Sequence, residues 1–459
     1  MKTTPFLALR CATVAVVAAL PQCDAFPAYA VSPPPIDHRR LPQPAPASPP
    51  QPTVQREVCA VPAMTRDVDT TGNSQLSGLD LPQVWKLTRG SGQRVAVIDT
   101  GVSPHPRLSR TAAGGDYVSA GKGDQDCDGH GTAVAGIVAA AADPGHSDDF
   151  SGVAPDVQLI SIRQSSNRFG SKADTSTSGV GDVDTLAKAV RTAADLGASV
   201  INISSVACIP SGSVLDDGAL GAALAYAVDT KNAVVVAAAG NSGPGQCPAQ
   251  PVEANWDTAT VVVSPAWYDE YVLTVGSIDP HGEASSFTLA GPWVDVAAPG
   301  EGVVSLSSSG AGLANALGGK QGPVPLSGTS YAAPVVSGLA ALIRSRFPQL
   351  TARQVMQRIT ATAHHPPGGR DTRVGAGPVD LLAAVSTGNP SSTAPQPART
   401  SVSIPPPVAP PEPPDHRAEH TAITGAAVCG GLLAAVITAS VLMTRLRRPT
   451  PADGNVLSD

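Results

Sequence analysis

Short apolar runs alternate with helical segments along the central part of the chain. Four runs rich in Val, Ile and Ala are typical of strands buried on both faces of a parallel sheet. Helices are predicted between them, together with a short amphipathic helix before the first run. The alternation predicts an α/β fold, a doubly wound parallel sheet with helices on both faces. The predicted strands are 94–99, 157–162, 199–206 and 233–239, and the predicted helices are 79–87, 183–196 and 220–230.

The stretch from Leu326 to Tyr331 places a serine at the start of a further predicted helix. A small, Gly-containing turn runs directly into residues 335–343, an apolar and small-residue run typical of a buried helix. Ser330 then lies where free backbone N–H groups and the helix dipole favour developing negative charge. Pro334 is expected in the first turn, where its missing N–H costs no hydrogen bond. By itself, a serine at this place is more often an N-cap than a nucleophile.

Two upstream stretches contain the partners that a serine nucleophile needs. Asp99 ends the run 94–99, at the carboxyl end of a predicted strand, where α/β proteins place their sites. His130 begins a second small-residue helix within the sequence Asp-Gly-His-Gly-Thr. Each residue alone is typical of a structural role. The chain order Asp, His, Ser is nevertheless that of subtilisin, and it differs from the orders in chymotrypsin and the α/β-hydrolases.

A fourth stretch supplies a side-chain donor for an oxyanion. The predicted strand 233–239 is followed by Gly240 and Asn241, and the Asn241 amide can donate to a developing negative charge. An Asn-Ser-Gly sequence after a strand is also an ordinary turn. The sequence contains no G-x-S-x-G elbow and no H-E-x-x-H zinc motif. This argues against the α/β-hydrolases and the zinc metalloproteases.

Together the four stretches resemble the subtilase family of serine proteases, over roughly residues 76–386. The resemblance implies a subtilisin-like fold and acyl transfer: Ser330 is the nucleophile, His130 transfers the proton and Asp99 orients His130. Asn241 and the Ser330 N–H would hold the oxyanion. Two strand edges would bind an extended peptide by strand addition, namely Ser204, Ser205 and Val206, and Ala237, Ala238 and Ala239. The matching motifs are Asp99-Thr100-Gly101, His130-Gly131-Thr132, Gly152-Val153-Ala154-Pro155, Gly240-Asn241, Val296-Ala297-Ala298-Pro299-Gly300 and Gly328-Thr329-Ser330-Tyr331-Ala332-Ala333-Pro334.

The N-terminal 75 residues precede the predicted peptidase domain. Residues 1–30 have a charged start, an apolar core at 11–20 and an Ala-Tyr-Ala cleavage site, as is typical of a signal peptide. Cys23 raises the alternative of a lipoprotein signal, but the preceding Pro21 and Gln22 are bulkier than such sites usually show. Residues 31–75 begin with a Pro-rich extension that is not expected to pack a core. A typical subtilase has a folded pro-domain at this place, and this extension is too short and too rich in proline to form one. Either folding of the peptidase domain needs no such intramolecular chaperone, or the extension lies against the enzyme as a mature part of it.

The C-terminal part predicts a membrane anchor. Residues 387–417 form a Pro-rich linker, and residues 421–444 contain no charged side chain and are long enough to cross a bilayer as a helix. The alternative, an apolar helix of a soluble protein, is disfavoured because Arg445, Arg447 and Arg448 follow at once. These arginines place the tail, 445–459, in the cytoplasm and the peptidase domain outside the membrane.

Cysteine positions indicate an oxidising compartment. Of the seven cysteines, two lie in the signal peptide and one in the anchor, which leaves four in three possible pairings. Two of these follow neighbouring predicted strands and can meet at the same sheet edge, so the predicted disulfides are Cys208–Cys247 and Cys59–Cys127. Free buried thiols are the alternative.

Composition and charge limit the classes of partner and cofactor that are expected. The net charge of −7 gives no indication of nucleic-acid binding, and with 3% aromatic residues the core must be built from Ala, Val, Gly and Leu. Asp124, Asp126 and Asp128 lack the Gly and Glu of a calcium loop, and we interpret them as a solvated turn. No metal and no cofactor is predicted.

The layout of signal peptide, Pro-rich arm, subtilase domain, Pro-rich stalk and one membrane helix, with the four cysteines, resembles the mycosins. These are membrane-anchored subtilases associated with type VII secretion in mycobacteria and related actinobacteria. The resemblance implies an extracytoplasmic endopeptidase that cleaves secreted proteins and joins a type VII secretion membrane complex. The alternative is a structural subunit that stabilises that complex and whose protease activity is incidental.

Overall fold

The computed structural model describes residues 31–65, 74–174, 179–243, 246–319 and 322–386. The predicted signal peptide, linker, membrane helix and cytoplasmic tail lie outside the described residues. Within the described ranges, no helix is both long and apolar enough to span a bilayer.

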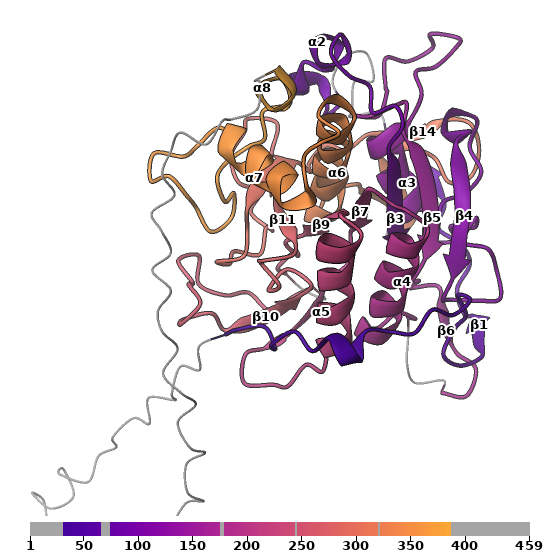
Figure 1. The fold of residues 1–459 in the computed structure, drawn as a ribbon. Helices are drawn as coiled ribbons and strands as arrows, with labels where there is room; N and C mark the ends of the chain where they lie inside the picture. Colours follow the sequence, from indigo (N-terminus) through magenta and orange to yellow (C-terminus); the bar gives the residue numbers. More distant parts are fainter. Residues whose placement is uncertain (1–30, 66–73, 175–178, 244–245, 320–321, 387–459) are drawn as a thin grey trace, which may run out of the picture. The chain divides into compact units, whose positions relative to one another are not determined.

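A seven-stranded parallel sheet forms the centre of the domain, in the order β12-β11-β9-β7-β3-β5-β4 (Figure 1). Every residue of β7, β9 and β11 is buried, as expected for strands covered on both faces. β3 is the first strand of this sheet in the sequence, and it lies between β5 and β7. The strand order therefore reverses around β3, and its carboxyl end opens onto a crevice. The bounds are β3 Arg94–Asp99, β4 Thr111–Asp116, β5 Gln158–Arg163, β7 Val200–Ile203, β9 Val234–Ala238, β11 Leu273–Ile278 and β12 Val296–Pro299.

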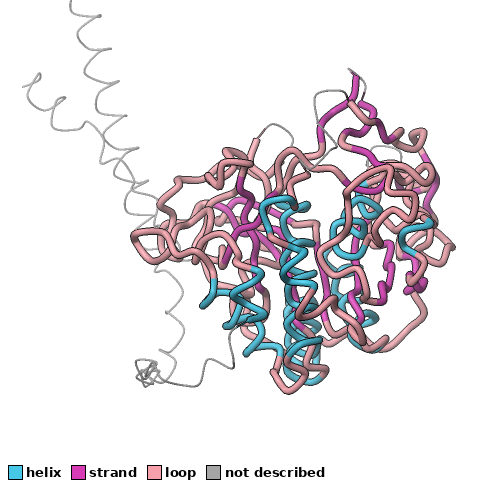
Figure 2. The backbone as a smooth tube through the Cα atoms, turned by 90° about the horizontal axis from the view of Figure 1, so that it is seen from above, coloured by secondary structure: helices cyan, strands magenta, loops and turns pink. Residues whose placement is uncertain are grey.

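α4 packs beside α5 (Figure 1), α3 packs beside α6, and both pairs contact the sheet. Figure 2 shows the helices and strands of the domain from above. α4 begins at a capping box formed by Asp182 and Thr185. The predicted helix 220–230 changes to a π-helical turn, η4 Tyr226–Thr230, and the predicted helix 79–87 is shorter than expected. The α-helices are α2 Leu81–Trp85, α3 His130–Ala139, α4 Val183–Asp195, α5 Gly218–Ala225, α6 Thr329–Arg346, α7 Ala352–Thr362 and α8 Leu381–Ser386.

Small residues allow the helices to approach the sheet layers closely. α3 buries nine of its ten residues, most of them Ala, Val or Gly. A Cβ on Gly136 would lie 2.4 Å from Ser305 Oγ and 2.9 Å from Leu306 Cγ, so the helix could not lie at this distance with any larger residue. The core therefore depends on backbone proximity rather than on large side chains, as the composition predicts.

Short strands and turns complete the domain and attach the N-terminal extension. The remaining strands are β1 Thr53–Gln55, β2 Pro62–Ala63, β6 Phe169–Ser171, β8 Ala207–Pro210, β10 Val261–Ser264, β13 Ser305–Leu306, β14 Leu313–Ala314, β15 Ala316–Gly319 and β16 Gly322–Pro325. The 3₁₀ turns are η1 His38–Arg40, η2 Ser77–Leu79 and η3 Pro106–Leu108.

The described part of the extension, residues 31–65, lies against the domain and contributes to its core. Val31 is buried and its N–H donates to the Trp256 carbonyl at 2.7 Å. β1 pairs with β6, and β2 pairs with β15. The prediction that this Pro-rich stretch packs no core is wrong, because its apolar side chains pack although its prolines cannot donate hydrogen bonds. The extension therefore lies against the enzyme, as the second alternative expects.

Two disulfides join the pairs predicted from the sequence, Cys59–Cys127 and Cys208–Cys247. Cys208 does not simply follow a strand of the central sheet. It lies in β8, which pairs antiparallel with β10, and Val263 is its partner in that ladder. Cys59 belongs to the extension, and the Ala60 N–H also donates to the Cys127 carbonyl at 2.8 Å. The extension is thus fixed covalently and by hydrogen bonds three residues before His130.

Candidate active site

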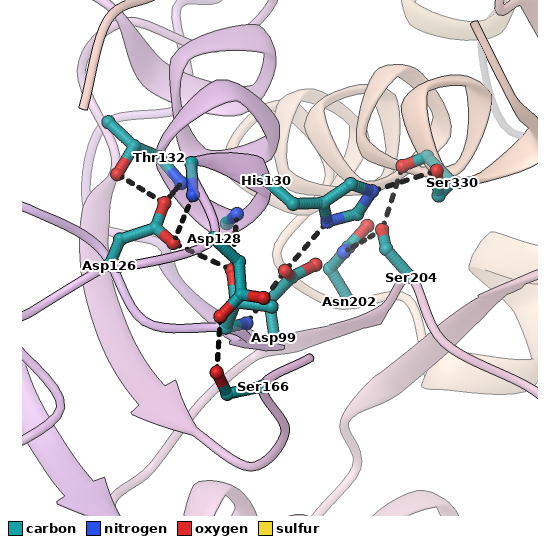
Figure 3. A network of polar contacts seen from close by, with 12 residues as sticks. Asp99, Asp126, Asp128, His130, Thr132, Ser166, Asn202, Ser204 and Ser330 are labelled. Atoms are coloured by element: carbon teal, nitrogen blue, oxygen red, sulfur yellow. Dashed lines mark hydrogen bonds and ion pairs between the residues drawn. The ribbon is translucent and has the colours of Figure 1, made fainter. Parts of the chain in front are cut away.

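Three side chains from three elements meet at the carboxyl edge of the sheet (Figure 3). Asp99 is the last residue of β3, His130 the first of α3 and Ser330 the second of α6. The His130 Nδ1 atom lies 2.7 Å from Asp99 Oδ1, and its Nε2 atom lies 2.9 Å from Ser330 Oγ. A histidine in this position can accept a proton from the serine while the carboxylate stabilises the imidazolium.

The local backbone fixes Asp99 in this orientation. Asp99 is buried, and its Oδ1 atom accepts the N–H of Thr100 at 2.7 Å as well as the His130 ring. A Cβ on Gly131 would lie 2.1 Å from the Gly101 carbonyl oxygen and 3.1 Å from Asp99 Oδ1. The glycines that follow Asp99 and His130 in the sequence therefore let the strand end and the helix start approach each other.

Electrostatics favour the charged form of His130. Burial lowers the pKa of this imidazole, but the charge of Asp99 and its hydrogen bond outweigh burial, and the net pKa is raised above the ordinary value of 6.5. The carboxylates of Asp126 and Asp128 act in the same direction. The site would therefore stabilise an imidazolium formed by proton transfer from a serine.

Asp126 and Asp128 are buried, so the interpretation of this aspartate cluster as a solvated turn is wrong for both residues. Asp126 Oδ1 accepts from Thr100 Oγ1 at 2.8 Å and from the Gly129 N–H at 2.8 Å. Its Oδ2 accepts from the N–H and the hydroxyl of Thr132. Burial raises its pKa to about 6, although the hydrogen bonds from Thr132 and Thr100 oppose that shift. Asp126 thus satisfies donors at the start of the His130 helix.

Asp128 connects the same helix start to the loop after β5. Its Oδ2 accepts from Ser166 Oγ at 2.5 Å and its Oδ1 from the Asn167 N–H at 2.8 Å. Only Asp124 of the three aspartates is exposed. Within the described ranges, no three His, Cys, Asp or Glu residues are grouped to hold a metal ion. The sequence signal for a buried Asp126 was the pair Thr100 and Thr132, which come shortly after Asp99 and His130 and whose hydroxyls donate to the Asp126 carboxylate.

Asn241 follows β9 and lies beside the start of α6. Its Oδ1 atom accepts both the N–H and the hydroxyl of Thr329, each at 3.0 Å, which fixes the orientation of the amide. A Cβ on Gly328 would lie 3.1 Å from Asn241 Nδ2 and 3.1 Å from Ser330 Oγ. Both polar atoms therefore border the same space, which the glycine leaves open. The Nδ2 donor is available to an oxyanion that forms there.

A cleft runs past these residues and contains part of the predicted peptide-binding edges. Ser204, Ser205, Val206 and Ala238 line it together with the site residues. Ala237, in β9, and Ala239, directly after β9, do not line the cleft, and both are fully buried. The sequence did not predict that the loop after β5 and the β15 hairpin also border the cleft. They contribute Ser165, Asn167, Arg168 and Leu317.

Pro334 lies in the second turn of α6 rather than in the first, because the helix begins at Thr329. Its missing N–H is therefore not one of the donors that any helix leaves free at its start, contrary to the prediction.

The fold, with an Asp, a His and a Ser at the carboxyl edge of a parallel sheet, defines the class of the subtilisin-type serine proteases.

Comparison with known proteins gives the family. Residues 90–377 match the Subtilase family (Peptidase S8). Mycosin-4 of Mycobacterium tuberculosis (strain ATCC 25618 / H37Rv) is 62% identical over 449 residues, which is 96% of this chain and 97% of that protein. The chain therefore belongs to the subtilase family of serine proteases and, within it, to the mycosins.

Solved structures agree with this assignment. The MycP3 protease from the type VII (ESX-3) secretion system is 47% identical, with a TM-score of 0.73 over 78% of this chain and 100% of that one. A chain in the intact ESX-5 inner membrane complex is 40% identical, with a TM-score of 0.75 over 90% of this chain and 100% of that one.

Proposed function

We propose that this protein is a membrane-anchored serine endopeptidase whose peptidase domain faces the extracytoplasmic side and cleaves secreted proteins. The observation that carries the proposal is the position of His130, within hydrogen-bond distance of both Asp99 and Ser330. The apolar segment 421–444 and the arginines after it support the anchor and its orientation.

The proposed reaction is acyl transfer in two steps. Ser330 Oγ attacks the peptide carbonyl while His130 Nε2 takes the hydroxyl proton, and Asp99 stabilises the imidazolium. The oxyanion accepts hydrogen bonds from Asn241 Nδ2 and the Ser330 N–H. His130 returns the proton to the leaving amine, and the C–N bond breaks. Water then attacks the acyl-enzyme by the same route and releases the acid.

Substrate would bind in extended form along the cleft. The segment Ser204, Ser205 and Val206 borders the cleft beside Ser330 and supports strand addition by a peptide, and Ala238 also lines the cleft. The exposed parts of these side chains are small, so main-chain hydrogen bonds would supply much of the affinity.

Labelling of the full-length protein by a fluorophosphonate tests the nucleophile. We expect stoichiometric labelling of the detergent-solubilised protein and no labelling of Ser330→Ala. Ser345→Ala changes a serine at the other end of the same helix and should label like the parent protein. Labelling that persists in Ser330→Ala would exclude Ser330 as the nucleophile.

A second candidate function is a structural role in a type VII secretion membrane complex. The observation that favours it is the likeness to a chain of the ESX-5 inner membrane complex, which extends over 90% of this chain. Secretion should then survive Ser330→Ala but fail when the gene is deleted. Loss of secretion in Ser330→Ala, with normal protein levels, would instead make proteolysis the required function.

A further inference from the structure

The backbone carbonyl of Ser330 lacks its usual helical partner. In α6 it faces residue 334, four positions later, and that residue is Pro334, which has no N–H to donate. A carbonyl left without a donor at a buried helix start would cost free energy. It would also leave the backbone at the proposed nucleophile less well fixed.

The hydroxyl of Ser204 replaces the missing donor. Ser204 Oγ donates to the Ser330 carbonyl at 2.8 Å, although the two residues are 126 positions apart in the chain. Ser204 directly follows β7 and is 8% exposed. The bond therefore joins the peptide-binding segment to the residue proposed to attack the peptide (Figure 3).

A chain of buried hydrogen bonds fixes the direction of this donation. The Ser330 carbonyl can only accept, so the single hydroxyl proton of Ser204 is committed to it. Ser204 Oγ then accepts from Asn202 Nδ2 at 2.9 Å, and Asn202 Oδ1 accepts from Ser337 Oγ at 2.8 Å. Asn202 and Ser337 are both fully buried. Because Ser337 is on α6, the chain of bonds starts and ends on the nucleophile's own helix.

We propose that Ser204 is a positioning residue for catalysis: its hydroxyl substitutes for the N–H that Pro334 lacks and fixes the Ser330 backbone against the peptide-binding segment. Fixing the Ser330 carbonyl holds in place the backbone from which the Ser330 side chain reaches His130. The role differs from substrate binding by the main chain of 204–206, which does not need the hydroxyl. The inference rests on Ser330 being the nucleophile.

The experiment is a double-mutant cycle on the full-length protein with a peptide substrate. Ser204→Ala removes the donor, and we expect kcat to fall roughly tenfold with KM within about twofold, because a partly buried carbonyl that has lost its donor relaxes away from its position. Pro334→Ala restores a backbone N–H and should by itself leave kcat within about twofold. The double variant Ser204→Ala/Pro334→Ala should recover most of the lost kcat, which a simple loss of packing would not allow.

Ser151→Ala is the matched control. Ser151 is also 8% exposed, and its hydroxyl donates to the Ala140 carbonyl at the end of α3, at 3.1 Å. This variant should lower Tm without lowering kcat, and Pro334→Ala should not change its kcat. Parental kcat in Ser204→Ala would overturn the inference, as would a folded double variant whose kcat stays low. Failure of the proposed function is recognised separately, by fluorophosphonate labelling that does not depend on Ser330.

Discussion

Asp126 and Thr132 are joined by two hydrogen bonds, because Asp126 Oδ2 accepts both the N–H of Thr132, at 2.8 Å, and its hydroxyl, at 2.7 Å. The pair places a buried carboxylate under the first turn of α3, the helix that begins with His130. A carboxylate at a helix start is favoured by the free N–H groups and by the helix dipole. It also adds negative charge near the imidazole that is proposed to act as the general base.

The first prediction concerns the pH dependence of peptidase activity. His130 must be neutral to accept the Ser330 proton. Burial lowers its pKa, but Asp99, with smaller contributions from Asp126 and Asp128, outweighs burial and raises the pKa overall. The acid limb of kcat/KM should therefore lie above the ordinary imidazole value of 6.5. Asp126→Asn removes one of these negative charges, so its acid limb should move to lower pH.

The matched control for this prediction is Asp124→Asn. Asp124 is exposed and is not among the groups that raise the pKa of His130. Its pH profile should coincide with that of the parent protein. Identical acid limbs in Asp126→Asn and the parent protein would show that Asp126 acts on the helix start alone and not on the charge of His130.

The second prediction concerns the oxyanion donor. Asn241→Ala should lower kcat by about 10²–10³, the loss found when the corresponding donor is removed from subtilisin, with little change in KM. The Oδ1 acceptor for Thr329 is lost in the same variant, so Asn241→Asp, which keeps that acceptor but not the donor, is the useful companion. Unchanged kcat in both variants would remove Asn241 from the oxyanion site.

Sequence patterns predicted the central strands and the three triad candidates because each depends on local signals. The strand 94–99 has the same bounds in the structure, and His130 begins its helix as predicted. Both features follow from an uninterrupted apolar run and from small residues at a helix start. The catalytic roles of these residues remain predictions that the experiments above test.

Features that depend on partners far apart in the sequence were not predictable in this way. Asp126 appeared to be solvated because one of its donors, Thr100, is 26 positions away, although Gly129 and Thr132 are close in the sequence. Pro334 appeared harmless at a helix start, and its compensation by Ser204 involves a residue 126 positions from Ser330. Composition alone likewise could not show that Val31 is buried by contacts with the distant segment around Trp256.

The third prediction concerns the pH dependence of stability. Burial raises the pKa of Asp295 to about 7, with a contribution from the charge of Asp269, against a value of 3.8 in the unfolded chain. Between these values the native state holds a proton that the unfolded chain has released. The stability that this group contributes is therefore present at low pH and is lost as the pH rises from about 4 to 7.

Urea unfolding at several pH values measures this effect. From pH 4 to 7, the free energy of unfolding of the parent protein should fall relative to that of Asp295→Asn by up to about 4 kcal/mol. Asp257→Asn, at an exposed position, should keep the parental pH dependence. If Asp295→Asn and the parent protein show parallel curves, Asp295 is ionised throughout that range.

The last prediction concerns the disulfide between the extension and the His130 loop. Cys59 and Cys127 are 68 positions apart, so the Cys59→Ala/Cys127→Ala variant should lose about 4 kcal/mol of unfolding free energy in the loop-entropy model. The Cys208→Ala/Cys247→Ala variant, with a separation of 39, should lose nearly as much. Only the first variant removes the covalent attachment of the extension, which leaves its strand pairings and hydrogen bonds, so only it should become more sensitive to limited proteolysis within residues 53–63. Because Cys127 lies between Asp126 and Asp128, the first variant should also show a shifted acid limb of kcat/KM. Crossed pairing in non-reducing peptide maps, or equal proteolytic resistance of the two variants, would contradict this account of how the extension is held.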